Sequence, residues 1–386
     1  MTGRFVAWRL AGFYGAIFAA VGIHIPFWPL WLADRGLAPS EIGILVAVGY
    51  LTRLIANPTV GHWVDHRGDR KRPMLILSMA AALLWLLFPF SQGFLPILVI
   101  TVVAIFPFTG LMPVGDSLAL MVTHSRSLDY GRVRLWGSLA FILSAVLVGR
   151  ALTHWPVSVL PWLISGMLAL TAVSCAALPD ARVPIQDTPP PPVRPLLKSG
   201  IFLLFLLTAA FNQSAHTVYY AFATLHWKAA GLSDAAIGIL WSEGVIAEVL
   251  LFAFSSRVVG RLGPARLLLA AALGGAVRWS VLGLTADPAM VALAQLLHAA
   301  TFGCAHLGAM HFIARAVPPS LSVRAQGVYA ALSVGLAPGL MTPASGYLYE
   351  QFGGGSFLAM AALSAGSALL GWRLLRCWDG GRLQPE

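Results

Sequence analysis

Residues 61–72 read Gly61-His-Trp-Val-Asp65-His-Arg-Gly68-Asp-Arg70-Lys71-Arg72 and join two long apolar runs, residues 41–64 and 73–91. Gly68 permits a tight turn, because glycine adopts left-handed backbone conformations without steric cost. We expect Asp65 to cap the preceding helix end and the basic residues to anchor the loop to anionic lipid headgroups. Apolar runs of roughly 20 residues on both sides of a charged turn are typical of two helices that each cross a membrane.

The composition extends this interpretation to the whole chain. Of the 386 residues, 58% are hydrophobic and 10% are charged, against roughly 45–50% and about 25% in soluble domains. The mean hydropathy is +0.78. Residues 75–90 and 201–211 are apolar on every face, whereas the strands of a transmembrane barrel alternate apolar and polar residues. The sequence therefore predicts a polytopic helical membrane protein and excludes a soluble enzyme.

The predicted fold is an all-α membrane protein with twelve transmembrane helices in two pseudo-symmetric six-helix bundles. The spans are drawn at residues 8–33, 41–64, 73–91, 94–123, 131–153, 157–178, 198–227, 234–258, 265–285, 288–315, 321–349 and 354–378. Of the 25 Lys and Arg, twenty then lie in loops or close to span ends on the side that holds both termini, three lie towards the other side, and two, Arg53 and Arg278, lie deep within spans. Because cytoplasmic loops carry the excess of Lys and Arg, we expect both termini in the cytoplasm and the chain in a bacterial inner membrane. Basic residues that flank spans also argue against a nucleic-acid partner.

A proline-rich stretch separates the two predicted halves. Residues 179–196 include four consecutive prolines, which cannot continue a helix, and we expect them to form a cytoplasmic linker between bundles at residues 1–178 and 197–386. An internal repeat supports this division, because an offset of 195 residues matches identical residues in the two halves without a gap. The matched positions are Gly36, Leu37, Ile42, Gly43, Ile44, Leu45 and Gly68 with Gly231, Leu232, Ile237, Gly238, Ile239, Leu240 and Gly263.

Five ionisable residues fall inside predicted spans, where a charge costs roughly 2.5–3.5 kcal/mol and indicates function. They are Arg53, Asp116, Glu243, Glu248 and Arg278. Arg53 lies about 18 Å up its helix from Asp65 at 1.5 Å per residue, close to the membrane midplane. The repeat offset places Arg53 and Glu248 at equivalent positions, so they form either a charge pair within packed helices or two ends of one substrate site. In the second case Arg53 binds a substrate carboxylate and Glu248 carries a proton, with Glu243 ranked below it.

Residues 61–72 match the signature G-x-x-x-D-x-x-G-x-R-[KR], and the chain therefore resembles the major facilitator superfamily. Residues 26–34 and 129–137 resemble those of lactose permease and, more closely, the phenylpropionate permease branch. The resemblance covers essentially the whole chain and implies a transporter built from two six-helix bundles. It also implies a gating loop that contains Gly61, Asp65, Gly68, Arg70 and Lys71.

The resemblance further implies sites in both halves. Asp116 and Arg134 align with the carboxylate and arginine that hold sugar in lactose permease, and Phe141 stands where the aromatic platform would be. Arg278 and His298 resemble members of its proton-coupling cluster. The glutamate expected three residues after that histidine is Thr301, so Glu248 is the nearest alternative proton carrier. Arg134 as a loop residue that sets topology, and His298 as a core residue, remain alternatives.

Tyr219 and Tyr220 lie in the middle of the seventh span and are expected to line the cavity. The leading hypothesis is a secondary active transporter that moves a small organic solute, an aromatic or other monocarboxylate such as phenylpropionate, with protons by alternating access. Sugar or nucleoside symport, drug efflux and a receptor without transport activity are the alternatives. The chain carries no P-loop, nucleophile elbow or H-E-x-x-H motif, which argues against an enzyme. We expect no cofactor or metal, contact with membrane lipid, and a monomer.

Overall fold

The computed structural model describes residues 3–180 and 194–383, and the elements found there are helical. The first six long helices are α1 (Gly3–Asp34), α2 (Pro39–Arg67), α3 (Lys71–Trp85), α4 (Phe94–Ser125), α5 (Tyr130–Ala151) and α6 (Leu160–Ala177), with short turns η1 (Phe88–Phe90) and η2 (Val157–Val159). The next are α7 (Arg194–Lys198), α8 (Gly200–Ser214), α9 (Thr217–Ala229), α10 (Asp234–Ala253), α11 (Ser255–Leu284) and α12 (Pro288–Leu296). The last are η3 (Ala299–Cys304), α13 (Ala305–Ala316), η4 (Pro319–Leu321), α14 (Ser322–Tyr329), η5 (Ala330–Leu336), α15 (Ala337–Phe352), η6 (Gly353–Gly355) and α16 (Ser356–Cys377).

Eleven helical stretches of the described chain are long and apolar enough to cross a membrane. The eleventh runs over 59 residues, Pro319–Cys377, and covers two of the predicted spans. A turn at Gly353, which has a φ of +52°, separates α15 from α16 within it. The predicted all-α membrane fold is therefore confirmed. The chain is a multi-pass membrane protein.

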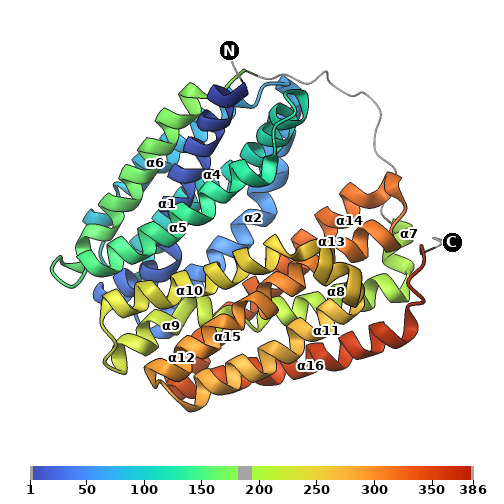
Figure 1. The fold of residues 1–386 in the computed structure, drawn as a ribbon. Coiled ribbons are helices and arrows are strands. Elements are labelled where there is room, and N and C mark those ends of the chain that lie inside the picture. The colour runs from blue at the N-terminus through green and yellow to red at the C-terminus, as the bar shows by residue number, and fades with distance from the viewer. Residues whose placement is uncertain (1–2, 181–193, 384–386) are drawn as a thin grey trace. The chain divides into compact units, whose positions relative to one another are not determined.

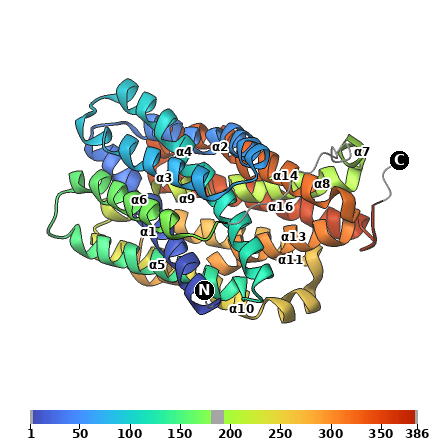
Figure 2. The same ribbon diagram turned by 90° about the horizontal axis from the view of Figure 1, so that it is seen from above.

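The chain divides into two compact units. The first contains α1 to α6 and the start of α10 through Ser242, and the second contains α7 to α9 and the chain from Glu243 onward. Most of the predicted linker, residues 181–193, lies outside the described residues, so the predicted domain boundaries stay a prediction. In the first unit α1 packs against α5 and α6, and in the second α11 runs along α16 (Figure 1, Figure 2).

The start of α10 belongs to the first unit because small residues let it approach α5 closely. A Cβ atom on Gly238 would overlap the carbonyl of Ala145, and a Cβ atom on Gly149 would meet the carbonyl of Asp234. The hydroxyl of Ser242 donates a hydrogen bond to the Ile142 carbonyl at 3.2 Å. Glycine at these two positions is therefore required by backbone-to-backbone packing.

Glycines that the 195-residue repeat pairs share a positive φ. Gly36 and Gly231 have φ of +78° and +92°, and Gly68 and Gly263 have φ of +63° and +71°. Glycine adopts a positive φ without steric cost, because it has no Cβ atom. The geometry agrees with the predicted repeat and confirms the tight turn expected at Gly68.

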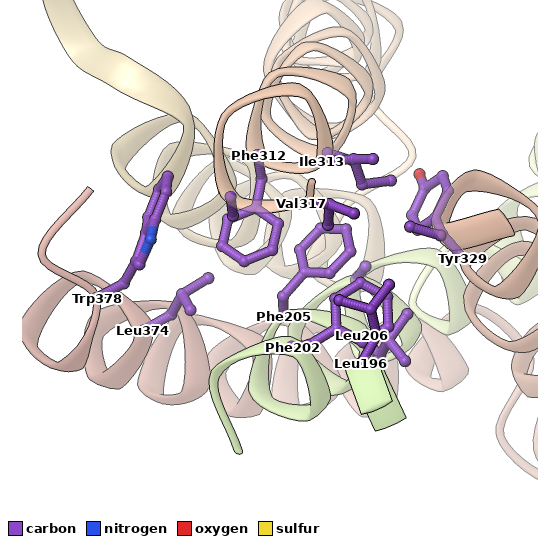
Figure 3. Close-up of a cluster of buried hydrophobic side chains, with 14 of the residues drawn as sticks. Leu196, Phe202, Phe205, Leu206, Phe312, Ile313, Val317, Tyr329, Leu374 and Trp378 are labelled. Carbon is purple, nitrogen blue, oxygen red and sulfur yellow. The ribbon is translucent and has the colours of Figure 1, made fainter. Parts of the chain in front are cut away.

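A cluster of buried aromatic and aliphatic side chains closes one end of the second unit (Figure 3). Phe205 of α8 stacks on Phe312 of α13, with ring centroids 4.3 Å apart, and Trp378 lies edge-on to Phe312 at 4.7 Å. The backbone N–H of Leu383 donates to the Ala316 carbonyl at 2.7 Å. The end of the described chain is thus tied to the same unit.

Candidate functional site

In the first unit, the carboxylate of Asp116 on α4 is held by two tyrosines. The hydroxyl of Tyr14 on α1 donates to Asp116 Oδ1 at 2.6 Å, and that of Tyr130, the first residue of α5, donates to the same oxygen at 3.0 Å. Hydrogen bonds to an ionised carboxylate are about twice as strong as bonds between neutral groups. The site that the sequence predicts around Asp116 therefore includes two hydroxyl donors that sequence analysis did not identify.

Arg134 lies beside Tyr14 but forms no ion pair with Asp116. Its guanidinium carbon lies 3.9 Å from the Phe18 ring centroid and 5.2 Å from that of Tyr14. Among the described residues, the Arg134 guanidinium has no hydrogen-bond acceptor, so its five N–H donors remain open to a ligand. Phe141 is only 6% exposed and packs inside the unit, so its role as an aromatic platform stays a prediction.

Arg53 is exposed on α2 and contacts an aromatic ring instead of an acid. Its guanidinium carbon lies 5.6 Å from the Tyr50 ring centroid. One turn further along α2, the side-chain oxygen of Asn57 is buried without a hydrogen-bond partner. On α1, the ring of His24 stacks on Trp28 at 5.9 Å and belongs to an aromatic group with Trp85 and Phe108. The first unit thus offers cations and aromatic rings, which suit an aromatic anion.

In the second unit, the fully buried Arg278 of α11 is at the centre of a polar network. One terminal nitrogen donates to His298 Nδ1 at 3.1 Å and to Thr301 Oγ1 at 3.0 Å. The other donates to Gln295 Oε1 at 2.7 Å. Its guanidinium carbon also lies 4.4 Å from the Tyr219 ring centroid. Three neutral acceptors therefore satisfy most of the donors of a buried cation.

The contact with Arg278 determines which nitrogen of His298 carries the proton. A guanidinium has donors only, so His298 Nδ1 must accept and the neutral ring must be protonated at Nε2. Nε2 lies 3.4 Å from Glu248 Oε2 on α10. A neutral histidine therefore connects a buried arginine to a partly buried carboxylate, and the predicted residues Arg278, His298 and Glu248 form one chain.

Of the other predicted residues in this unit, Tyr219 is part of the network and Tyr220 lies next to it. Gln295 Nε2 donates to the Tyr219 hydroxyl at 2.9 Å, and the Tyr220 ring stacks on His216 at 5.8 Å. Glu243 is half-buried five residues before Glu248. The sequence analysis did not identify Gln295, although an amide side chain three residues before His298 in an apolar span could have indicated it.

The loop at residues 61–72 differs from expectation at one position. The Asp65 carboxylate is exposed and accepts no hydrogen bond from the described residues, because α2 continues to Arg67 and ends where the Gly68 N–H donates to the Val64 carbonyl at 2.9 Å. The expectation that Asp65 caps the helix end is therefore wrong. Asp69 is the capping acid instead: its Oδ1 accepts from the backbone N–H of Lys71 at 3.0 Å and caps the start of α3.

Arg70 connects the same loop to α4. The Arg70 side chain is 8% exposed and donates from Nε to the Ser117 hydroxyl on α4 at 2.8 Å. Gly61 and Lys71 are half-buried. Their roles in gating stay predictions. Within residues 3–180 and 194–383, no group of three or more His, Cys, Asp or Glu side chains is arranged to hold a metal ion.

Two bundles of apolar helices with charged residues inside their spans define a membrane transporter of the major facilitator type. Residues 7–359 match the model of the MFS_1 like family, and the chain belongs to this family. It is 32% identical over 362 residues to a probable 3-phenylpropionic acid transporter of Escherichia coli strain K12, a match that covers 92% of this chain and 94% of that protein. It is 28% identical over 353 residues to a maltose permease of Geobacillus stearothermophilus, covering 88% and 87%.

Solved structures of low sequence identity share the fold. The nucleoside transporter NupG matches with a TM-score of 0.79 and 14% identity, over 96% of this chain and 98% of that one. A D-xylose-proton symporter matches with a TM-score of 0.74 and 14% identity, over 98% and 99%. The family model and the 32% identical relative confirm the expected membership of the superfamily, and the protein is therefore a transporter and not an enzyme.

Proposed function

We propose that this transporter carries an aromatic or other monocarboxylate across the bacterial inner membrane together with a proton. The observation that carries the proposal is that Arg53 and Arg134 of the first unit contact aromatic rings, and that no carboxylate of the described chain pairs with either of them. An unpaired cation within a membrane span is costly. A substrate carboxylate neutralises the charge of the guanidinium and accepts two parallel hydrogen bonds from it. The name of the phenylpropionic acid transporter to which the chain is 32% identical supports the same substrate class.

In this proposal Arg53, near the membrane midplane, receives the carboxylate, while Asp116 and Arg134 line the same half of the protein. Phe141, Tyr219 and Tyr220 contact the remainder of the solute. The solute alternates between the two sides of the membrane as the halves rock around it. The functional unit is a monomer in contact with membrane lipid, with both termini in the cytoplasm and no nucleic-acid partner.

The proton site of the proposal is the chain of Glu248, His298 and Arg278. Glu248 takes up the proton, because His298 is held neutral by its bond from Arg278 and donates towards the carboxylate. Glu243 is the second-ranked acid. One acid for one proton has a consequence for energetics: a monocarboxylate anion that moves with one proton carries no net charge. Its accumulation then follows the pH gradient and not the membrane potential.

Transport into proteoliposomes tests this stoichiometry. When the outside is one pH unit more acidic than the lumen and there is no membrane potential, 3-phenylpropionate should accumulate in the lumen up to about tenfold. One pH unit corresponds to about 1.4 kcal/mol per proton. An inside-negative potential of about 100 mV alone should give no accumulation. Symport of a neutral sugar with a proton would instead respond to that potential, which is worth about 2.3 kcal/mol per charge. The maltose permease match makes sugar the second candidate, and potential-driven maltose uptake without phenylpropionate uptake would replace the proposal.

A further inference from the structure

A cavity of about 490 Å³ opens at the end of the second unit, beside the turn at Gly263. Its walls come from α11 and α13 and contain two cationic or ionisable side chains, His311 and Arg315, among apolar and glycine residues such as Val259 and Pro264. Both side chains are exposed, and within the described parts of the chain neither has a hydrogen-bond or ion-pair partner. The cavity therefore presents unpaired positive charge next to an apolar wall.

The surroundings of the cavity add to this charge. Arg257, Arg261 and Arg266 are exposed on the segment of α11 that forms the cavity wall. Among the described residues of the chain end, the acid is Asp379, next to Gly380, whose added Cβ atom would lie 3.5 Å from an Arg315 nitrogen. The Asp379 carboxylate accepts the backbone N–H of Gly381 at 2.8 Å. Among the described residues of α11, α13 and the chain end, this one carboxylate stands against at least four arginines, which leaves an excess of positive charge around the opening.

We propose that this cavity binds the phosphate group of an anionic phospholipid. The lining is mixed: Arg315 and His311 suit a phosphodiester, whereas Val259, Pro264 and Ala314 suit the glycerol and first methylenes of the acyl chains. A free inorganic ion would gain nothing from the apolar wall. In the equivalent turn of the first unit, Arg70 is buried and its Nε donates to the Ser117 hydroxyl, so this arginine is engaged within the protein, whereas Arg315 is exposed.

The proposal is tested on the full-length protein in nanodiscs of phosphatidylcholine with and without phosphatidylglycerol. Native mass spectrometry should show phosphatidylglycerol retained by the wild type. Arg315→Gln should weaken its retention about fivefold, which corresponds to about 1 kcal/mol for one basic residue. Arg315→Lys should retain most of the binding, and Arg373→Gln, at an exposed arginine of α16 outside the cavity, should bind like the wild type.

Folding is checked by thermal unfolding in phosphatidylcholine alone, where all four proteins should behave alike. Equal phosphatidylglycerol retention by the wild type and Arg315→Gln would overturn the proposal. So would an equal loss in Arg373→Gln, since that would reflect general surface charge. Stabilisation by inorganic phosphate as strong as that by the lipid, at matched ionic strength, would show a phosphate site and refute the lipid assignment.

Discussion

Replacing Glu248 with glutamine should separate solute movement from proton movement. Glutamine has nearly the same shape as a protonated glutamate, and its amide oxygen can still accept from His298 Nε2, which lies 3.4 Å from the carboxylate oxygen. The network around Arg278 should therefore remain intact. What the variant loses is the ability to take up and release a proton during the cycle.

The expected size of the effect follows from the single acid in the chain. Wild-type protein in proteoliposomes should accumulate 3-phenylpropionate about tenfold per unit of pH gradient, which is about 1.4 kcal/mol per proton. Glu248→Gln should reduce this accumulation to none, while counterflow of labelled against unlabelled substrate persists. The matched control is Glu243→Gln on the same helix, half-buried and five residues earlier. It should keep the full gradient-driven accumulation.

Three outcomes would refute this reasoning. If Glu248→Gln accumulates substrate as well as the wild type, the contact with His298 is structural only. If Glu243→Gln loses accumulation and Glu248→Gln does not, the proton is carried by the half-buried acid. Loss of counterflow in Glu248→Gln, with normal unfolding temperature, would show that the carboxylate binds substrate directly.

Three further predictions concern the first unit. Arg53→Gln should weaken substrate binding in a thermal-shift titration by roughly 30-fold, because the substrate carboxylate loses a charge-assisted bidentate partner, a loss of about 2 kcal/mol; unchanged affinity would contradict its assignment. Gly68→Ala should lower the free energy of unfolding by about 1 kcal/mol, because its φ of +63° is strained for any residue with a Cβ atom, whereas Gly61→Ala, which has open space, should have little effect. Gly238→Leu should push α10 away from Ala145 and impair transport while substrate binding persists, and normal transport would show that the close packing is not needed.

The sequence was sufficient for features that depend on spacing along the chain. The turn at Gly68 and its counterpart at Gly263 could be predicted, because a left-handed residue between two apolar runs leaves a signal in composition. Arg278 could be identified because charged residues are rare in spans, and His298 because its surroundings resemble those of a histidine in lactose permease. The contact between His298 and Glu248 could not be predicted, because it depends on how α10 rotates against the segment between α12 and η3.

The partners of Asp116 and the end of α2 could not be predicted from residue spacing, because they depend on contacts and backbone conformations in three dimensions. Tyr14 donates to Asp116 across 102 positions of sequence, and a tyrosine in an apolar span is not distinguishable from one at a lipid interface. Asp65 was expected to cap its helix, but the helix continues two residues further and Asp69 caps the next one. Where a helix ends is decided by the conformation of the residue after it, which a charge pattern does not specify.

The paired glycines also bear on the history of the chain. Gly36 with Gly231, and Gly68 with Gly263, keep a positive φ although the polar side chains of the two halves have diverged. One half now holds an aspartate between tyrosines, and the other an arginine between neutral acceptors. If the halves descend from one duplicated ancestor, the turns are the part that could not change, since only glycine enters that conformation freely. The side chains facing the solute were then free to specialise, one copy for the cargo and the other for the energy source.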